Sequence, residues 1–317
     1  MGENAPGRMR RRPFWRAARE GLVGMGKAMR LGGLGTLVVA VVGALALSGG
    51  PAMAAPSSTP VAYTCTGGDF QTGTLVPIPS GIYASITVKG ACQTVPHAEI
   101  TVVGDVNVAA GAVLDAQSYP STITVGHDVT AGPGSLLGLG CLPDPVGHTT
   151  GHPCVDDPLT ASSSITIDGN VTASDANAVL LNGITVKGNV TLIGSEGTAT
   201  AAERHTAIPW AVKTNTIGGD LIVSDMTPLW LGVLLNNVGG SVILTNVSIT
   251  DGLPTDPLTK PGDVDTTPTI YVASNRIEQN LVCSGLGPYL FAGSPGEVNL
   301  VRGQGIGQCD GPGSEHP

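Results

Sequence analysis

The sequence is poor in aromatic and charged residues: Phe, Trp and Tyr make up 3% of the chain, and Asp, Glu, Lys and Arg together 12%. Positive charge is scarcest after residue 54, where seven Lys and Arg stand against 22 Asp and Glu, a net charge of about −15. This balance argues against nucleic acids and anionic membrane surfaces as partners.

Helical patterns and common catalytic motifs are also missing after residue 54. No window of 11 or more residues there carries an apolar stripe at helical spacing. The chain has no G-x-S-x-G, H-E-x-x-H or P-loop motif. The only match to motifs of the polygalacturonase-like kind is Asp156-Asp157, in a proline-rich stretch. These absences weigh against an enzyme.

The first 54 residues have the pattern of an export signal. Residues 31–48 are apolar and uncharged, a long basic stretch precedes them, and Ala52-Met53-Ala54 offers small residues for cleavage before Ala55. The pattern predicts a signal peptide over 1–54 with an extended basic n-region, a secreted protein, and no membrane attachment after cleavage. The basic stretch is either a twin-arginine motif at Arg11-Arg12 or lies upstream of a true start at Met25 or Met29.

Cysteines occur only after this leader, and an even number in an exported chain indicates disulfides. Six cysteines allow 15 pairings, and proximity in the sequence favours joining each to its neighbour. The expected pairs are Cys65–Cys92, Cys141–Cys154 and Cys283–Cys309. The first and last pairs lie at opposite ends of the chain, where terminal repeats need support.

The segment I-T-V-x-G-[D/N]-V recurs along the chain. Its final position falls at Val106, Val129, Val171, Val190, Leu221, Val242 and Leu281. The steps are near 20 residues or about twice that, which is typical of stacked repeats. Apolar residues alternate within each copy, as in half-buried strands. We expect the glycine to supply unusual backbone angles at a corner between two strands.

These features predict an all-β fold, a single-stranded parallel β-helix of about eight coils, right-handed and disulfide-capped at both ends. It would form one domain over 55–317, with loop insertions near 132–164, 194–214 and 251–269. A β-sandwich is the alternative, because short alternating strands suit it too.

A polar residue follows the glycine of each copy. As a repeat-corner ladder these residues would satisfy backbone groups, and as a column of oxygens they would bind Ca²⁺. We favour the ladder, because the spacing lacks the dense glycine–aspartate repeat of calcium-binding solenoids. The ladder residues are Asp105, Asp128, Asn170, Asn189, Asp220, Ser241 and Asn280.

Three further groups have a structural and a functional reading. The first group consists of residue types that bind zinc: Cys141, His148, His152 and Cys154. An oxidising compartment favours a disulfide between the two cysteines instead. A second group is acidic and could bind a cation, but we favour a solvated loop. Its residues are Asp251, Asp256, Asp263 and Asp265. Aromatic residues that would either stack on sugars or fill the core edges are Trp210, Trp230, Tyr271 and Tyr289.

The C-terminal stretch carries a resemblance. Residues 280–287 (NLVCSGLG) and 299–309 (NLVRGQGIGQC) resemble the GQC-containing ending of exported bacterial β-solenoid repeat proteins of unknown function. This chain departs from that pattern by having Val301-Arg302-Gly303-Gln304 where the family usually has a Gly-Asn. The repeats also faintly resemble bactofilins, which are polymer-forming, cytosolic and poor in cysteine. The resemblance implies a fold and an export route, and no reaction.

The sequence therefore predicts a secreted, non-enzymatic structural or adhesive protein of the cell exterior without cofactor or metal. Expected partners are extracellular polysaccharide, other cell-envelope components or further copies of the chain. The alternative is a polysaccharide lyase or glycoside hydrolase on the same scaffold.

Overall fold

The computed structural model describes residues 59–143, 152–196, 210–228, 231–249, 270–288, 290–293, 296–311 and 314–315. The predicted signal peptide and the predicted 251–269 loop lie outside these ranges. The described residues belong to one compact unit, Pro56–Pro317. None of them is helical, and all pairings between their strands are parallel, which excludes a β-sandwich.

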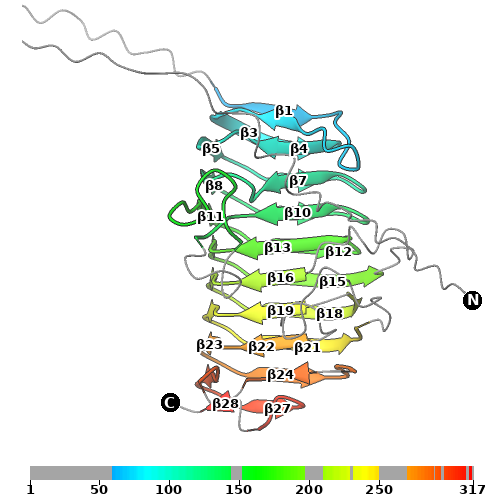
Figure 1. Ribbon diagram of the computed structural model, residues 1–317, viewed down its shortest axis with the longest axis vertical. Coiled ribbons are helices and arrows are strands. Elements are labelled where there is room, and N and C mark those ends of the chain that lie inside the picture. Colours follow the sequence, from blue (N-terminus) through cyan, green and yellow to red (C-terminus); the bar gives the residue numbers. More distant parts are fainter. Residues whose placement is uncertain are drawn as a thin grey trace, which may run out of the picture. The chain divides into compact units, whose positions relative to one another are not determined.

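The strands form two sheets. The smaller sheet has nine strands, one from each successive turn of the chain (Figure 1). In order they are β2 (Val76–Ile78), β4 (Ala91–Thr94), β7 (Val113–Ala116), β10 (Leu136–Leu139), β13 (Ala178–Asn182), β16 (Trp210–Lys213), β19 (Leu231–Leu234), β22 (Ile270–Ala273) and β25 (Leu290–Phe291).

The larger sheet has 19 strands and begins with β1 (Val61–Cys65) and β3 (Gly81–Val88). The strands that precede the motif corner in each turn are β5 (Ala98–Val102), β8 (Ser121–Val125), β11 (Ser164–Ile167), β14 (Thr185–Val186), β17 (Thr216–Ile217), β20 (Asn237–Val238), β23 (Arg276–Ile277), β26 (Asn299–Val301) and β28 (Ser314–Glu315). The strands that follow the corner are β6 (Val106–Val108), β9 (Val129–Ala131), β12 (Val171–Ser174), β15 (Val190–Glu196), β18 (Leu221–Thr227), β21 (Val242–Val247), β24 (Leu281–Ser284) and β27 (Gly305–Gly307).

The predicted single-stranded parallel β-helix of about eight coils is wrong. The strands are divided between two parallel sheets, of 19 and nine strands, and the smaller sheet lies outside the repeated motif. Its strands include β10 and β13, which fall between motif copies and are buried along their whole length. Because a strand covered on both faces is continuously apolar, it gives no alternating signal. The repeated motif therefore predicts strands of the larger sheet only.

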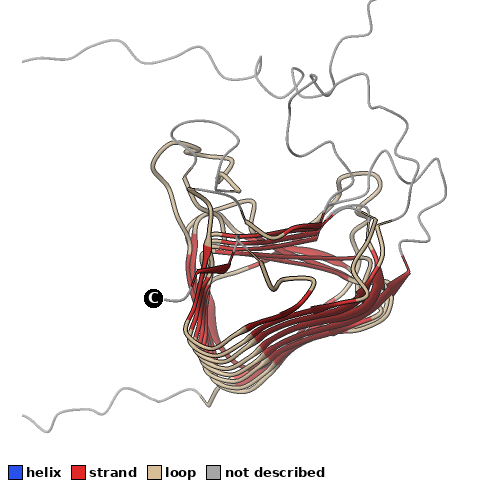
Figure 2. Cartoon of the chain, turned by 90° about the horizontal axis from the view of Figure 1, so that it is seen from below, coloured by secondary structure: helices blue, strands red, loops and turns tan. Residues whose placement is uncertain are grey.

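The motif positions nevertheless lie in register along the larger sheet. Val106 pairs with Val129, which pairs with Val171, and the series continues to Leu281. The partners are buried, and successive turns overlie one another on three sides of one apolar core (Figure 2). Each buried Val or Leu contributes about 1.5–3 kcal/mol, so this core is the main source of stability.

The motif glycines have a different role from the one expected. None of Gly169, Gly188, Gly219 and Gly240 adopts a left-handed φ. A Cβ at these positions would instead lie 2.0–2.4 Å from the side-chain oxygen of the polar corner residue in the preceding turn. Glycine is required because a side chain of the previous turn occupies the space.

Left-handed residues bend the chain elsewhere in each turn. Gly183 leads from the smaller sheet into the larger one with φ 68°, and the equivalent Thr214, Leu235 and Ser274 have φ between 56° and 59°. Two predicted insertions are shorter than expected, because β10 lies within 132–164 and β16 within 194–214.

The three expected disulfides are present. Cys65–Cys92 joins the first turns and Cys283–Cys309 the last, while Cys141–Cys154 closes a loop in the middle of the chain. Three disulfides fit an extracellular or otherwise oxidising environment. Within the described ranges there is no helix of the length and hydropathy needed to cross a membrane.

Candidate functional site

The predicted corner residues lie one above another and are linked by hydrogen bonds. The Oδ1 atom of Asp128 accepts the backbone N–H of Asn170 at 2.7 Å, and Asn170 in turn accepts the N–H of Asn189 at 2.9 Å. The same contact recurs at 2.7–3.3 Å from Asp105 to Asn280, whose Oδ1 accepts the N–H of Gln304. One oxygen of each corner residue is thus committed to the next turn.

This geometry does not favour the calcium alternative. Asn or Ser occupies four of the seven positions of the column, so the carboxylates are diluted. Among the residues that the structure describes, no group of three or more His, Cys, Asp and Glu side chains is placed to hold a metal ion.

A second ladder, of buried asparagines, is not among the sequence predictions. Asn215, Asn236, Asn275 and Asn299 are at most 2% exposed. Each of the first three donates its backbone N–H and its Nδ2 to the Oδ1 of the next asparagine, at 2.9–3.2 Å. Nδ2 also donates to a carbonyl of the preceding turn, as Asn236 does to Val212 at 2.8 Å.

The asparagine ladder continues a column that begins with isoleucine. Register places Ile100, Ile123, Ile165 and Ile184 in line with Asn215. The N–H of Ile184 donates to the Oδ1 of Asn215 at 3.0 Å, so the two halves are joined. The signal was present in the sequence, because the later motif copies open with Asn where the earlier ones open with Ile.

The two cysteines of the candidate zinc group form a disulfide that closes a loop. Its two sulfurs are bonded to each other and are therefore not available as thiolate ligands. His148 lies outside the described residues. Burial lowers the pKa of His152, and the positive Lys213 adds to this effect, while Asp115 opposes it. The imidazole is therefore neutral at neutral pH.

The Asp156-Asp157 pair is exposed in the same loop. The Asp157 carboxylate accepts the hydroxyl of Thr160 and the backbone N–H groups of Leu159 and Thr160. These bonds, above all that from the Thr160 hydroxyl, lower the pKa of Asp157. The aspartate closes a turn, as Asp residues commonly do.

The outer face of the smaller sheet carries the most varied side chains. We define the outer column as the register partners on this face. They are Gln93, Asp115, Gly138, Leu180, Ala211, Gly232, Tyr271 and Phe291. The column is polar at one end, small or apolar in the middle, and aromatic at the other end. It is the candidate functional site.

The polar end is internally satisfied. One oxygen of Asp115 accepts the Gln93 side-chain amide and the Ser118 hydroxyl, both at 2.6 Å. The other accepts the backbone N–H groups of Gln117 and Ser118, at 3.1 and 2.9 Å. A carboxylate that accepts four hydrogen bonds has its lone-pair positions occupied and holds its loop in place.

The aromatic end of the column is partly accessible. Tyr271 and Phe291 are both partly exposed, and their ring centroids lie 4.9 Å apart with the planes tilted by 43°. Leu180 and Ala211 in the middle are buried in a second apolar cluster. Of the other predicted aromatic residues, Trp230 and Tyr289 lie outside the described residues, and Trp210 lies in β16. The acidic run from Asp251 also lies outside the described residues.

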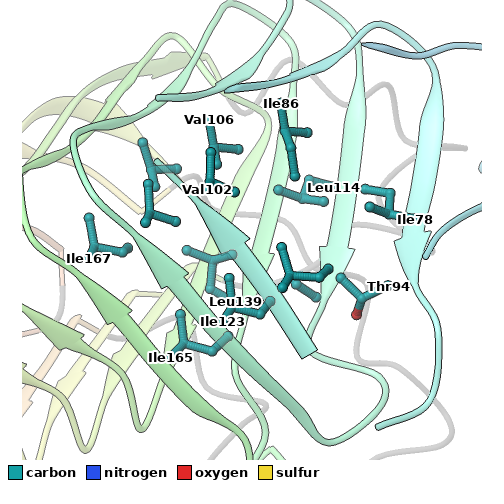
Figure 3. Close-up of a pocket in the computed structure, with 14 residues that line it drawn as sticks. Ile78, Ile86, Thr94, Val102, Val106, Leu114, Ile123, Leu139, Ile165 and Ile167 are labelled. Atoms are coloured by element: carbon teal, nitrogen blue, oxygen red, sulfur yellow. The ribbon is translucent and has the colours of Figure 1, made fainter. Parts of the chain in front are cut away.

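Among the described residues, side chains of the first four turns line a cavity of about 30 Å³ in the interior (Figure 3). Fourteen side chains line it, all from buried positions, and Thr94 is the only polar one. It offers no group for acid–base chemistry. No protein-family model, curated protein or solved structure matches the chain.

Proposed function

We propose that the protein is an exported, non-enzymatic structural or adhesive component of the cell exterior. The stacked turns form a rigid scaffold, and the aromatic end of the outer column contacts extracellular polysaccharide. The observation that carries the proposal is the use of polar side chains: both ladders and Asp115 direct their oxygens to backbone donors of the chain itself.

Rigidity follows from how successive turns are joined. Besides the backbone pairing of the two sheets, a polar ladder at the corner and an asparagine ladder in the interior connect each turn to the next. Buried amide networks with every partner in place resist local opening, because each lost hydrogen bond leaves a desolvated group. The disulfides at both ends restrain the terminal turns.

The aromatic pair is the feature that favours a sugar ligand. A flat, partly exposed ring offers an apolar face to the C–H groups of a pyranose. Tyr271 and Phe291 come from adjacent strands, so their rings occupy a fixed place on a rigid sheet. The small Gly232 beside Tyr271 leaves no side chain at the next position of the column.

A glycan array and a polysaccharide-degradation screen on the exported protein test this proposal. We expect binding without release of oligosaccharide, and weaker binding by the Tyr271→Ala, Phe291→Ala double variant. Tyr63→Ala is the matched control, because Tyr63 also pairs with another ring, Tyr83, at 5.2 Å and 45° but at the opposite end of the chain. The control should bind like the wild type.

Two results would overturn the proposal. Reproducible release of oligosaccharide would identify the protein as a polysaccharide-active enzyme. If the protein binds no glycan, no envelope fraction and no other cell-surface material, it has no adhesive role. Equal loss of binding in the double variant and in Tyr63→Ala would move the contact away from the outer column.

A further inference from the structure

The interior cavity has an identifiable cause in one inward-facing column of the smaller sheet. Register aligns Ile78 with Thr94, and Ala116 with Leu139. Thr94 and Ala116 are neighbours in this column, because Gln93 and Asp115 beside them pair. The column continues below with Leu181, Val212, Val233 and Val272.

Ala116 is the small side chain of this column, because Thr94 has the volume of Val and the next turn supplies Leu139. The space that Ala116 leaves in its turn is about one strand spacing high, roughly 5 Å. The opposite walls cannot close it, because their Ile and Val residues are fixed by backbone pairing in the larger sheet. Figure 3 shows Ile86, Val102 and Val106 on the wall that faces Leu114 and Thr94.

The chemistry of the lining decides what can occupy the space. A volume of about 30 Å³ is large enough for a water molecule. A buried water needs two to four polar partners, however, and Thr94 is the only polar residue in the lining. Its buried hydroxyl has no hydrogen-bond partner among the described residues. All the other lining side chains are Ile, Val, Leu or Ala.

We propose that this cavity is a dry binding site for one compact apolar molecule, of the size of a xenon atom or dioxygen. Such a guest gains dispersion contacts with the surrounding methyl groups and gives up no hydrogen bonds on leaving water. The Ile and Val residues in register around the gap provide these contacts on several sides. The inference is independent of the proposed function.

Xenon is the probe that tests the proposal. The purified wild-type protein is titrated with xenon, and we expect a saturable change in the chemical shift of the xenon NMR signal. Ala116→Leu puts into the gap the residue that the next turn already has at Leu139, and should abolish the saturable shift. Ala110→Leu is the matched control: it adds the same atoms at an exposed position outside the lining and should leave the shift unchanged.

Thr94→Val separates a dry cavity from a hydrated one, and does not depend on the larger side chain fitting. It conserves volume while removing the unpartnered hydroxyl. In a dry cavity the variant keeps the xenon response, and its urea midpoint rises. Thr124→Val, on the exposed face of β8, should leave the midpoint unchanged.

A fall in the midpoint of Thr94→Val would indicate a lost water-mediated contact and would overturn the proposal. So would the lack of a saturable xenon shift in the wild type, or its persistence in Ala116→Leu.

Discussion

Replacing Asn236 by alanine should destabilise the protein far more than a typical single substitution. The side chain is 1% exposed and makes four hydrogen bonds. Its Oδ1 accepts the backbone N–H and the Nδ2 of Asn215, both at 3.0 Å. Its Nδ2 donates to the Val212 carbonyl at 2.8 Å and to the Oδ1 of Asn275 at 3.0 Å.

The expected loss of unfolding free energy follows from the groups left behind. Alanine removes the acceptor of two buried Asn215 donors and the donor to the Val212 carbonyl. A buried polar group without a partner costs about 1–3 kcal/mol. Three such groups give a total of about 3–9 kcal/mol, which is large for one side chain.

Urea unfolding of the disulfide-bonded protein, followed by circular dichroism, measures this loss. Asn237→Ala is the control, because Asn237 is the next residue, is exposed, and should change the free energy by less than about 0.5 kcal/mol. Asn236→Asp should be as damaging at neutral pH, since a carboxylate cannot donate to Val212 or Asn275. If Asn236→Ala unfolds within about 1 kcal/mol of the wild type, the interior ladder does not stabilise the stack.

Leu235→Gly should raise the urea midpoint of unfolding, because Leu235 has φ 58°, a conformation that costs a non-glycine residue about 1–2 kcal/mol. The control Leu234→Gly, in β19, should lower the midpoint, and equal effects of the two substitutions would contradict the argument. Acid should destabilise the wild type more than His152→Asn. Burial lowers the pKa of His152, so the unfolded chain binds more protons there, and the stabilisation is complete above about pH 6.5 and lost as pH falls below it; superimposable stability–pH curves would refute this. Replacing Cys283 and Cys309 by alanine opens a 26-residue link and should cost about 3–4 kcal/mol, with hydrogen exchange rising first in the last turns; uniform exchange along the chain would argue against local capping.

The larger sheet could be predicted because one of its faces is exposed. Thr101 and Thr124 point outward between the buried Ile100, Val102 and Ile123, which produces the alternation that marks a strand. The neighbour pairing of the cysteines was also predictable, since proximity along the chain agrees with proximity between adjacent turns.

The smaller sheet and the interior ladder could not be read in the same way. The strands at Leu136–Leu139 and Ala178–Asn182 are buried on both faces, so they show no alternation. The motif is defined by its glycine and gives no weight to the position where Ile changes to Asn, so it does not predict the role of Asn236. The motif also predicts a backbone role for its glycine, whereas Gly240 is needed to admit the Asp220 side chain.

The join between Ile184 and Asn215 can be made in only one direction. An isoleucine turn can precede an asparagine turn, because its amide meets the Oδ1 that follows. In the reverse order an aliphatic side chain would stand where the backbone N–H and one Nδ2 hydrogen of the last asparagine need an acceptor. Lengthening either block from within avoids this loss, whereas an isoleucine turn placed after an asparagine turn would leave two buried donors unpaired, at about 1–3 kcal/mol each.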